Sequence, residues 1–557
     1  MKIADYLVDV LNSYGVTDAF GIPGGVILDF LYSLNSGRST VQPHLNYHEQ
    51  MAGFAACGYA QASGKLGVAY ATRGPGICNM VTCIAEAYQE SLPVLFITAH
   101  GNKSTHGTRF DDNQELDIVN VVRSITKYSA VIDKLEDLKH IKTACDIAIK
   151  GRKGPIVLDF AAPLWNKEIA DEIINDFADQ TKGYVCFDEI IGDIKKQLKI
   201  SKRPIILIGD GLRHSTDIDR LRAVAEKINI PILSSRGAQD LLCGINNYFG
   251  YIGSHGIRYS NFILSKADYI ISIGNRLAFQ TESKSFNHFV KDICWTRVDI
   301  DKDEFSRKMD KAHSFELDAG RFIDYLYENN ITIPGSYQGW LKTCSEIKTQ
   351  LFTADCIDVV DELTEIISVN PIDVVYVTDA GNNEFWFSRA FEKVQKKGTI
   401  LASKSFGTTG SALGKAIGAY YAFKKPITCV IGDQGFQFNL QELSYISQWK
   451  LPIRIIVINN QKSGMIADQE IRRFDNKFHV SANDGYKPVD IQKIATAYGI
   501  DYLSNWQVSI KDDYKPLIYE IKEKEEDKLI PCLPKGNPCQ KMEPALSDEL
   551  FNYLESL

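Results

Sequence analysis

Short β-branched apolar runs alternate with segments of helical periodicity along almost the whole chain. The clearest case has an apolar run at Ile427–Ile431, a helical pattern at about Asn439–Lys450 and a second apolar run at Ile453–Ile458. Two short apolar runs joined by a helix predict a βαβ unit with parallel strands. Asp433 follows the first run and Asn460 follows the second. Both are therefore expected at the carboxyl edge of one sheet, where open α/β sheets bind ligands.

The same alternation continues in both directions and divides the chain into three units. Strand and helix patterns predict domains over residues 1–165, 186–335 and 355–526, followed by a tail over 527–557. An acidic and weakly periodic stretch, Lys167–Cys186, is predicted to link the first two domains. Repeated strand–helix alternation indicates parallel sheets covered by helices. The sequence therefore predicts an α/β protein with three doubly wound parallel-sheet domains.

Composition narrows the class of protein. A length of 557 residues allows several cores, and a net charge of −8 argues against a general nucleic-acid surface. No apolar stretch reaches the length of a membrane helix, and the first residues lack the features of a secretory signal. The twelve cysteines show no zinc spacing and are expected to be reduced, although Cys532 and Cys539 could pair. We expect a cytoplasmic protein without nucleic-acid or membrane partners.

The residue types that follow the two predicted strands suit a magnesium ion. A carboxylate beside an amide offers hard oxygen ligands, and Mg²⁺ is usually completed by phosphates and water. Gly432, Gly435 and Gly464 would let the backbone approach a bulky anion closely. The alternative is a βαβ unit whose turn residues bind nothing. Because Asn460 comes 27 residues after Asp433, on the next predicted strand, the pair favours the metal site.

Gly432-Asp433, followed by Asn459-Asn460, resembles the diphosphate-binding signature of thiamine diphosphate (ThDP) enzymes. The segment HEQMAGFAACGYAQASGKLGV with the later GPG resembles RHEQ…A…GYAR…GK…GPG of the acetolactate synthase catalytic subunit, and the resemblance covers nearly the whole chain. It implies pyrimidine-binding, central and diphosphate-binding domains, with ThDP and Mg²⁺ as cofactors. In that family the cofactor usually bridges two subunits, so a homodimer or homotetramer is implied.

The resemblance assigns residues to both ends of the cofactor. Glu49 would hydrogen-bond the pyrimidine N1′ and promote loss of the thiazolium C2 proton, whereas on sequence grounds alone it is a favourable first-turn residue of a helix. Asp433, the Asn460 side chain and the backbone carbonyl of Lys462 would bind Mg²⁺. The remaining cofactor-binding positions implied are Pro75, Asn79, Ala380, Gly381, Asn382, Asn383, Gly407, Thr409, Gln434, Gly435, Ser463, Gly464 and Met465.

Two further segments resemble the substrate pocket of the family. The loop GIPGG ends at Gly25, and Asn113-Gln114-Glu115 contains a glutamine that would face the reaction intermediates. With Glu49, Gly25 and Gln114 are the predicted catalytic positions; a solvated loop amide is the alternative for Gln114.

Four positions of the cofactor-binding segments depart from the family pattern. Thr409 stands in place of a methionine, Gln434 in place of a small residue, Asn383 in place of a histidine and Arg73 in place of a serine.

The implied activity is decarboxylation of pyruvate, or a close 2-oxo acid, and transfer of the two-carbon acyl-anion unit to a carbonyl acceptor. Acetolactate synthesis is the family default. Gln469 stands where the family carries a tryptophan that favours 2-oxobutyrate, and Arg472 and Arg473 follow. This polar setting suits a nucleotide-linked keto sugar as acceptor, unless the arginines lie on a solvated loop. A 2-oxo acid decarboxylase or oxidase and a catalytically weak ThDP-binding scaffold stay open.

FAD is left open as a further cofactor. The segment GYIGSHGIRYSN and the turn Gly274-Asn275-Arg276 resemble flavin-binding stretches of acetolactate synthases, but the Asp-Asp-Arg that follows in those enzymes is replaced. Gly209-Asp210-Gly211 after a predicted strand is a weak phosphate-loop signal.

Overall fold

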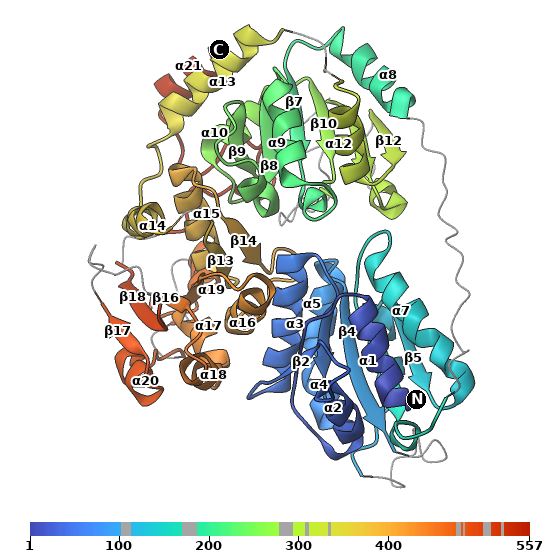
Figure 1. Ribbon diagram of the computed structural model, residues 1–557. Coiled ribbons are helices and arrows are strands. Elements are labelled where there is room, and N and C mark those ends of the chain that lie inside the picture. The colour runs from blue at the N-terminus through green and yellow to red at the C-terminus, as the bar shows by residue number, and fades with distance from the viewer. Residues whose placement is uncertain are drawn as a thin grey trace. The chain divides into compact units, whose positions relative to one another are not determined.

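The structure is a computed structural model that describes residues 1–101, 113–169, 187–277, 293–306, 311–331, 333, 336–371, 373–474, 481–482, 485–504, 514–524 and 528–557. Across these residues it holds three six-stranded sheets, with helices on both faces of each (Figure 1). The predicted α/β class with three doubly wound parallel sheets is confirmed. Most of the predicted linker Lys167–Cys186, and the domain ends predicted at residues 186, 335, 526 and 527, lie outside the described residues.

By its internal contacts the chain forms two compact units. One consists of Met1–Thr181, Val374–Glu384 and Leu401–Lys522, and so contains the first sheet and most of the third. The other consists of Lys182–Asp373, Phe385–Ile400 and Glu523–Leu557, and contains the central sheet. The first and third domains can therefore be described together, and the central domain by itself.

The first sheet has the strand order β2-β1-β3-β4-β6-β5, and all five strand pairings are parallel. Every residue of β3, β4 and β6 is buried and most are apolar, as expected for central parallel strands covered on both faces. Its strands are β1 (Asp18–Gly21), β2 (Gln42–Leu45), β3 (Gly67–Tyr70), β4 (Val94–His100), β5 (Tyr128–Ile132) and β6 (Ile156–Ala161). Its helices include α1 (Ile3–Ser13), α2 (Leu28–Leu34), α3 (Glu49–Ser63), α4 (Pro75–Asn79), α5 (Val81–Gln89), α6 (Ile118–Val122) and α7 (Lys139–Ile149).

The third sheet has the order β14-β13-β15-β16-β18-β17. Strands β15 and β16 are parallel neighbours, and Gly432 pairs with Ile458, so the predicted βαβ unit is confirmed. The strands are β13 (Val375–Thr378), β14 (Thr399–Ala402), β15 (Ile427–Gly432), β16 (Ile453–Asn459), β17 (Asp501–Leu503) and β18 (Leu517–Lys522). The helices include α15 (Asn382–Val394), α16 (Ala412–Phe423), α17 (Asp433–Phe438), α18 (Glu442–Gln448), α19 (Gly464–Arg473) and α20 (Ile491–Ala497).

One element of this unit was not predicted. Helix α18 lies within the helix expected at about Asn439–Lys450, whereas a second helix, α17, precedes it and begins at Asp433 itself. Gly432 is extended and the next residue is already helical, whereas Asn439, with φ −144° and ψ 46°, ends α17. Asp433 is therefore at a helix N-terminus rather than in an open turn.

Helices α3 and α16 bring the first and third domains together inside one compact unit. A Cβ placed on Gly418 would lie 1.8 Å from the carbonyl oxygen of Ala55, and one on Gly58 would lie 2.3 Å from that of Lys415. The glycines of these two helices thus allow backbone-to-backbone contact. The same contact buries an ion pair between Lys415 of α16 and Glu86 of α5, with both side chains fully inaccessible to water.

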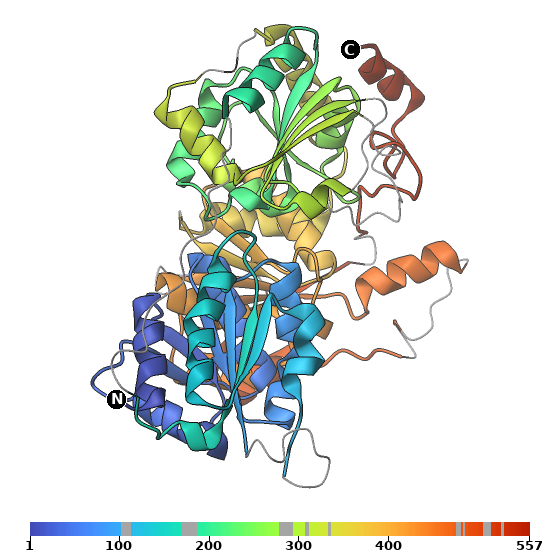
Figure 2. The same cartoon turned by 90° about the vertical axis from the view of Figure 1, so that its right-hand side faces the viewer.

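The central sheet has the order β12-β11-β10-β7-β8-β9 (Figure 2). Its strands are β7 (Pro204–Ile208), β8 (Ile232–Ser235), β9 (Tyr248–Ile252), β10 (Tyr269–Ile273), β11 (Cys294–Asp299) and β12 (Ala312–Glu316). The helices of this compact unit include α8 (Phe187–Leu198), α9 (Ile218–Lys227), α10 (Arg258–Ser265), α12 (Ala319–Glu328), α13 (Gln338–Leu351), α14 (Asp358–Val369) and α21 (Asp548–Ser556).

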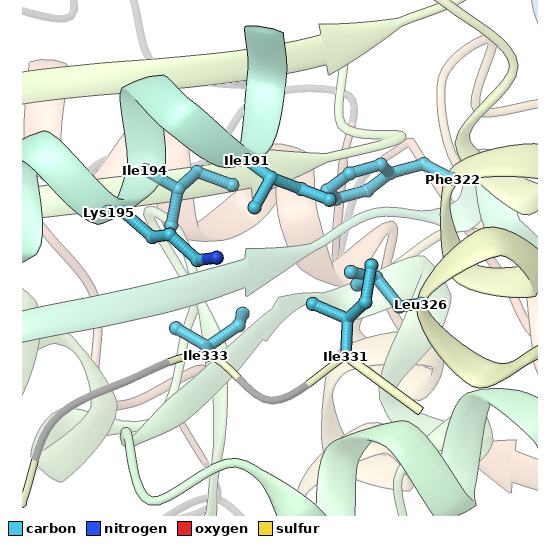
Figure 3. A pocket seen from close by; sticks show the side chains of 7 residues that line it. All are labelled: Ile191, Ile194, Lys195, Phe322, Leu326, Ile331 and Ile333. Carbon is cyan, nitrogen blue, oxygen red and sulfur yellow. The ribbon is translucent and has the colours of Figure 1, made fainter. Parts of the chain in front are cut away.

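A small hollow lies between α8 and α12 in the central domain. It is lined by apolar side chains and one lysine, which Figure 3 shows around a common space. The lining residues are Ile191, Ile194, Lys195, Phe322, Leu326, Ile331 and Ile333. This almost wholly apolar lining does not suit a charged cofactor.

Two predictions from composition can be compared with the structure. None of the cysteines that it describes, Cys532 and Cys539 among them, forms a disulfide. Within the described ranges no helix is long and apolar enough to span a bilayer.

Candidate cofactor-binding site

The two predicted metal ligands lie at neighbouring strand ends of the third sheet. Asp433 is buried at the start of α17, and Asn460 follows β16. The preceding residue, Asn459, turns the other way and donates to Glu520 Oε1 at 2.6 Å, because consecutive side chains of a strand face opposite sides. The Oδ1 of Asn460 accepts the backbone N–H of Lys462 at 3.3 Å, so two of the three predicted ligands share one tight loop after β16.

The carboxyl group of Asp433 is held in a dry setting. Burial raises the pKa of Asp433 to about 6, while hydrogen bonds from Tyr486 and from the backbone, including Asn460, act in the opposite direction. Tyr486 donates its O–H to Asp433 Oδ2 at 2.9 Å. A divalent cation beside this carboxyl would favour its ionised form.

The donor set fits Mg²⁺ better than a softer metal. No group of three or more His, Cys, Asp or Glu side chains in the described part of the chain could hold a metal. The predicted set instead has one carboxylate with amide and carbonyl oxygens, which phosphate oxygens and water would complete, as is usual for Mg²⁺.

The loop after β13 lies beside this metal set. A Cβ on Gly464 would be 2.4 Å from Asn460 Nδ2 and 3.0 Å from Asn382 Nδ2. The absence of a side chain at Gly464 therefore allows the loop after β16 to approach the loop after β13 closely. Asn383 is buried and donates from Nδ2 to the backbone oxygen of Asp379 at 2.7 Å. Asn382 Oδ1 is buried without a hydrogen-bond partner among the residues that the structure describes. An unpartnered polar atom at this position fits a loop that binds a polar ligand.

Asp379 is a site residue that sequence reasoning missed. It is fully buried directly after β13, and burial raises its pKa to about 7. Its two carboxyl oxygens accept the backbone N–H groups of Gly410 at 2.8 Å and Ala412 at 3.2 Å. Asp379 therefore holds the turn Gly407–Gly410, which contains two predicted cofactor-binding positions, beside the loop Ala380–Asn383. The available signal was its place after a buried strand, the same pattern that identified Asp433.

The same turn is held from the first domain. Glu90, which follows α5, accepts the backbone N–H groups of Ser405 at 2.5 Å and Phe406 at 2.9 Å. Within the turn, Gly407 and Gly410 have φ values of +70° and +84°, which glycine adopts readily. The hydroxyl of Thr408 is buried and has no hydrogen-bond partner in the described residues. The neighbouring Thr409, predicted to support the cofactor, is half-buried.

Glu49 is the first residue of α3, as predicted, and is half-buried. His48 caps this helix by accepting the backbone N–H of Gln50 at 3.1 Å. Asn79 at the end of α4 donates to Glu49 Oε2 at 2.9 Å, and a Cβ on Gly76 would lie 3.5 Å from Glu49 Oε1. The structure thus brings Glu49 together with Asn79 and the start of α4 at Pro75.

A buried carboxyl that sequence reasoning missed supports the loop before Glu49. Glu442 of α18 is fully buried and accepts the backbone N–H of Tyr47 at 2.9 Å and Asn46 Nδ2 at 3.1 Å. Burial raises the pKa of Glu442 to about 7. The residue lies almost 400 positions away in sequence, so no local pattern could have found it.

The two predicted substrate segments meet the turn after β3. A Cβ on Gly24 would lie 2.3 Å from Thr72 Cβ, and one on Gly74 would lie 2.3 Å from the backbone oxygen of Gln114. Gln114 has φ +61°, a conformation that is uncommon outside glycine and is often found at functional sites. Gly25 and Gln114 are both exposed. Their loops flank the turn that leads to Pro75, so the catalytic positions predicted in the first domain converge.

The Gly209–Gly211 loop of the central domain is not an anion cradle. The backbone N–H of Gly209 donates to Ile273 at 2.9 Å, and that of Gly211 donates to Gly274 at 3.0 Å. A phosphate loop presents such N–H groups to its ligand, and here they join two strand ends. The weak phosphate-loop signal was therefore misleading. The segment after Leu277 that bears on FAD lies outside the described residues.

Of the residues predicted to favour a polar acceptor substrate, Gln469 is exposed on α19. Arg473, at the end of this helix, is exposed too. The side chain of Arg472 lies outside the described residues.

Comparison with known proteins agrees with the three-domain fold. Three family models match: the N-terminal TPP binding domain of thiamine pyrophosphate enzymes over residues 1–121, their central domain over 191–326 and their C-terminal TPP binding domain over 379–532. Thiamine pyrophosphate is another name for ThDP. The chain is 30% identical to an acetolactate synthase large subunit of Lactococcus lactis, over 95% of this chain and 94% of that one. It is 31% identical to that of Cyanidium caldarium, over 95% and 92%, and 28% identical to the isozyme 2 large subunit of Escherichia coli, over 90% of each.

Proposed function

Because the chain belongs to the thiamine pyrophosphate enzymes and is a relative of acetolactate synthase large subunits, we propose that it decarboxylates a 2-oxo acid and transfers the acyl unit onward. The donor is pyruvate or a close 2-oxo acid, and the two-carbon acyl-anion unit passes to a carbonyl acceptor. The observation that carries this proposal is the pairing of Glu49 with Asn79 beside the turn at Pro75, in a chain that also places Asp433 next to Asn460.

In this proposal the third domain binds the charged end of the cofactor. Asp433, Asn460 and the carbonyl of Lys462 hold Mg²⁺, and the loops of Ala380–Asn383 and Ser463–Met465 surround the diphosphate. Gln434 and Gly435 lie at the N-terminus of α17, where backbone N–H groups favour an anion. When bound, ThDP supplies an electron sink that allows carbon dioxide to leave.

Glu49 holds and transfers the proton on which this chemistry depends. Its carboxyl exchanges a proton with the pyrimidine N1′, and Asn79 fixes the carboxyl by donating to Oε2. Gly25 and Gln114 stand on loops beside this group and would contact the substrate.

The acceptor is either a second 2-oxo acid, which gives acetolactate, or a larger polar carbonyl compound. Gln469, which stands in place of the family's tryptophan, supports the second candidate, a nucleotide-linked keto sugar. Polar and charged side chains such as Gln469 and Arg473 suit the phosphates and hydroxyl groups of such a molecule.

We also propose that the chain works as a homodimer or homotetramer. Pro75, Asn79 and Gln114 are exposed in the single chain, although each is assigned to a site that must exclude water. A second copy that covers these residues would complete the site. Light scattering of the purified protein would test this assembly, and a monomer that retains full activity would refute it.

The experiment that tests the function is an incubation of pyruvate with the protein, ThDP and Mg²⁺, in which carbon dioxide and all products are quantified. Acetolactate equal to the carbon dioxide released establishes the synthase. Slow carbon dioxide release that a nucleotide-linked keto sugar accelerates establishes the sugar acceptor. Acetaldehyde, or acetate with peroxide, replaces the carboligase proposal with a decarboxylase or an oxidase. If the protein binds ThDP tightly but releases no carbon dioxide from any 2-oxo acid, it is a ThDP-binding scaffold and the proposal is overturned.

A further inference from the structure

The carboxyl group of Asp433 has a neighbour that neither the sequence pattern nor the family comparison assigns. Tyr486 lies in a separate segment of the chain, 53 residues further on, and is half-buried. Its hydroxyl donates to Asp433 Oδ2 at 2.9 Å. Gln437, one turn after Asp433 on α17, donates from Nε2 to the same hydroxyl at 2.7 Å.

These contacts fix the direction of the hydrogen bonds. A phenol hydroxyl has one proton to donate and can accept as well, whereas an amide NH₂ group only donates. Since Tyr486 accepts from Gln437, its own proton points to Asp433. The result is a short relay, Gln437 to Tyr486 to Asp433, that begins and ends on one helix.

The segment that carries Tyr486 is also fastened to the other metal-binding loop. The backbone N–H of Ser463 donates to the carbonyl oxygen of Ser481 at 2.7 Å, and the hydroxyl of Ser481 bonds the carboxylate of Glu470 on α19. Residues 481 and 486 therefore contact the loops that follow β16 and β15 respectively. One segment thus tethers both halves of the predicted magnesium site.

We propose that Tyr486 is a positioning residue for the metal-binding carboxylate. It occupies one oxygen of Asp433 and sets the rotation of the carboxyl plane, so that the other oxygen is presented to the cation. Ligating carboxylates are commonly oriented by such outer hydrogen bonds, whose loss lowers metal affinity about 10- to 100-fold. Because this inference rests on the proposed ThDP and Mg²⁺ site, its test must separate the two.

The test compares full-length wild type, Tyr486→Phe and Gln437→Met in Mn²⁺ binding with ThDP present, with free Mn²⁺ measured by electron paramagnetic resonance. Tyr14→Phe is the matched control, because Tyr14 also donates to a carboxylate, Asp146, at 2.6 Å, but in the first domain. We expect the Kd for Mn²⁺ to rise about 10- to 100-fold in Tyr486→Phe, less in Gln437→Met, and by under about twofold in Tyr14→Phe. The kcat at saturating metal should return close to the wild-type value.

An unchanged Kd in Tyr486→Phe, with tight metal binding by the wild type, would overturn the role of Tyr486 and leave the proposed function standing. A wild type that binds ThDP without any metal would overturn both. If Tyr486→Phe fails to fold, as judged by near-ultraviolet circular dichroism, Gln437→Met decides the question by the same criterion.

Discussion

The buried ion pair between Lys415 and Glu86 makes a sharp prediction about stability. Both side chains are fully inaccessible to water, and the nearby Glu90 is half-buried. Burial alone would lower the pKa of Lys415, but the charges of Glu86 and Glu90 more than offset this effect, so its pKa is raised. Lys415→Met keeps most of the side-chain volume and removes the charge. It leaves two carboxyl groups in a dry site without their cation.

Removal of one partner from a buried pair costs about 3–5 kcal/mol, mainly because the remaining charge is left uncompensated. A chain of this size is not expected to unfold in one step, so the midpoint of thermal unfolding at a fixed scan rate is the suitable readout. For domains of 150–250 residues, 1 kcal/mol corresponds to about 2–4 °C. We therefore expect Lys415→Met to unfold on the order of 10 °C below wild type at pH 8.

The difference in unfolding midpoint between wild type and Lys415→Met should be smaller at pH 5 than at pH 8. Burial, and then the charge of Glu86, raises the pKa of Glu90 already in the wild type, and loss of the cation raises it further. A carboxyl with a raised pKa binds more protons in the folded state than in the unfolded state, so stability falls as pH rises through that interval. Lys425→Met, at an exposed position, serves as the control. The double variant, Lys415→Leu with Glu86→Leu, should recover most of the loss in unfolding midpoint. A Lys415→Met midpoint within about 2 °C of wild type at pH 8 would refute this reasoning.

Two further predictions concern other carboxyl groups. Asp433→Ala should abolish the Mg²⁺ dependence of ThDP binding and weaken that binding at least about tenfold, as measured by titration calorimetry; tight metal-dependent binding by the variant would contradict the ligand role. Glu442→Gln should gain stability relative to wild type between pH 5 and pH 8, by up to about 3 kcal/mol, because burial raises the pKa of Glu442 to about 7 and its ionisation in the folded state is costly. A constant difference in unfolding midpoint across that pH range would show that Glu442 ionises without such a cost.

The strands and the edge that carries the metal set could be predicted because buried parallel strands appear as short β-branched runs. Ile427–Ile431 and Ile453–Ile458 lie within observed strands, and their ends place Asp433 beside Asn460. Helix α17 was missed because six residues are too few to show a periodic pattern. The error changed the setting of Asp433, which gains a helix N-terminus.

The supporting groups could not be predicted in the same way. Glu442 contacts Tyr47 across 395 positions, and Tyr486 contacts Asp433 across 53. Such partners are chosen by packing in three dimensions, and nothing in their local sequence marks them. The pairing of Lys415 with Glu86 is of the same kind, since a lysine within an otherwise apolar helix gives no indication of which carboxylate will accompany it.

The central claim is tested most directly by carbon dioxide release from pyruvate by wild type and Glu49→Gln, each saturated with ThDP and Mg²⁺. If Glu49 manages the cofactor proton, wild type should release carbon dioxide and the variant should be slower by about 10²- to 10⁴-fold, the usual contribution of a general acid–base group. The variant should still bind ThDP, because its diphosphate loops are unchanged. Equal rates from the two proteins would contradict the assignment of Glu49 and the mechanism built on it.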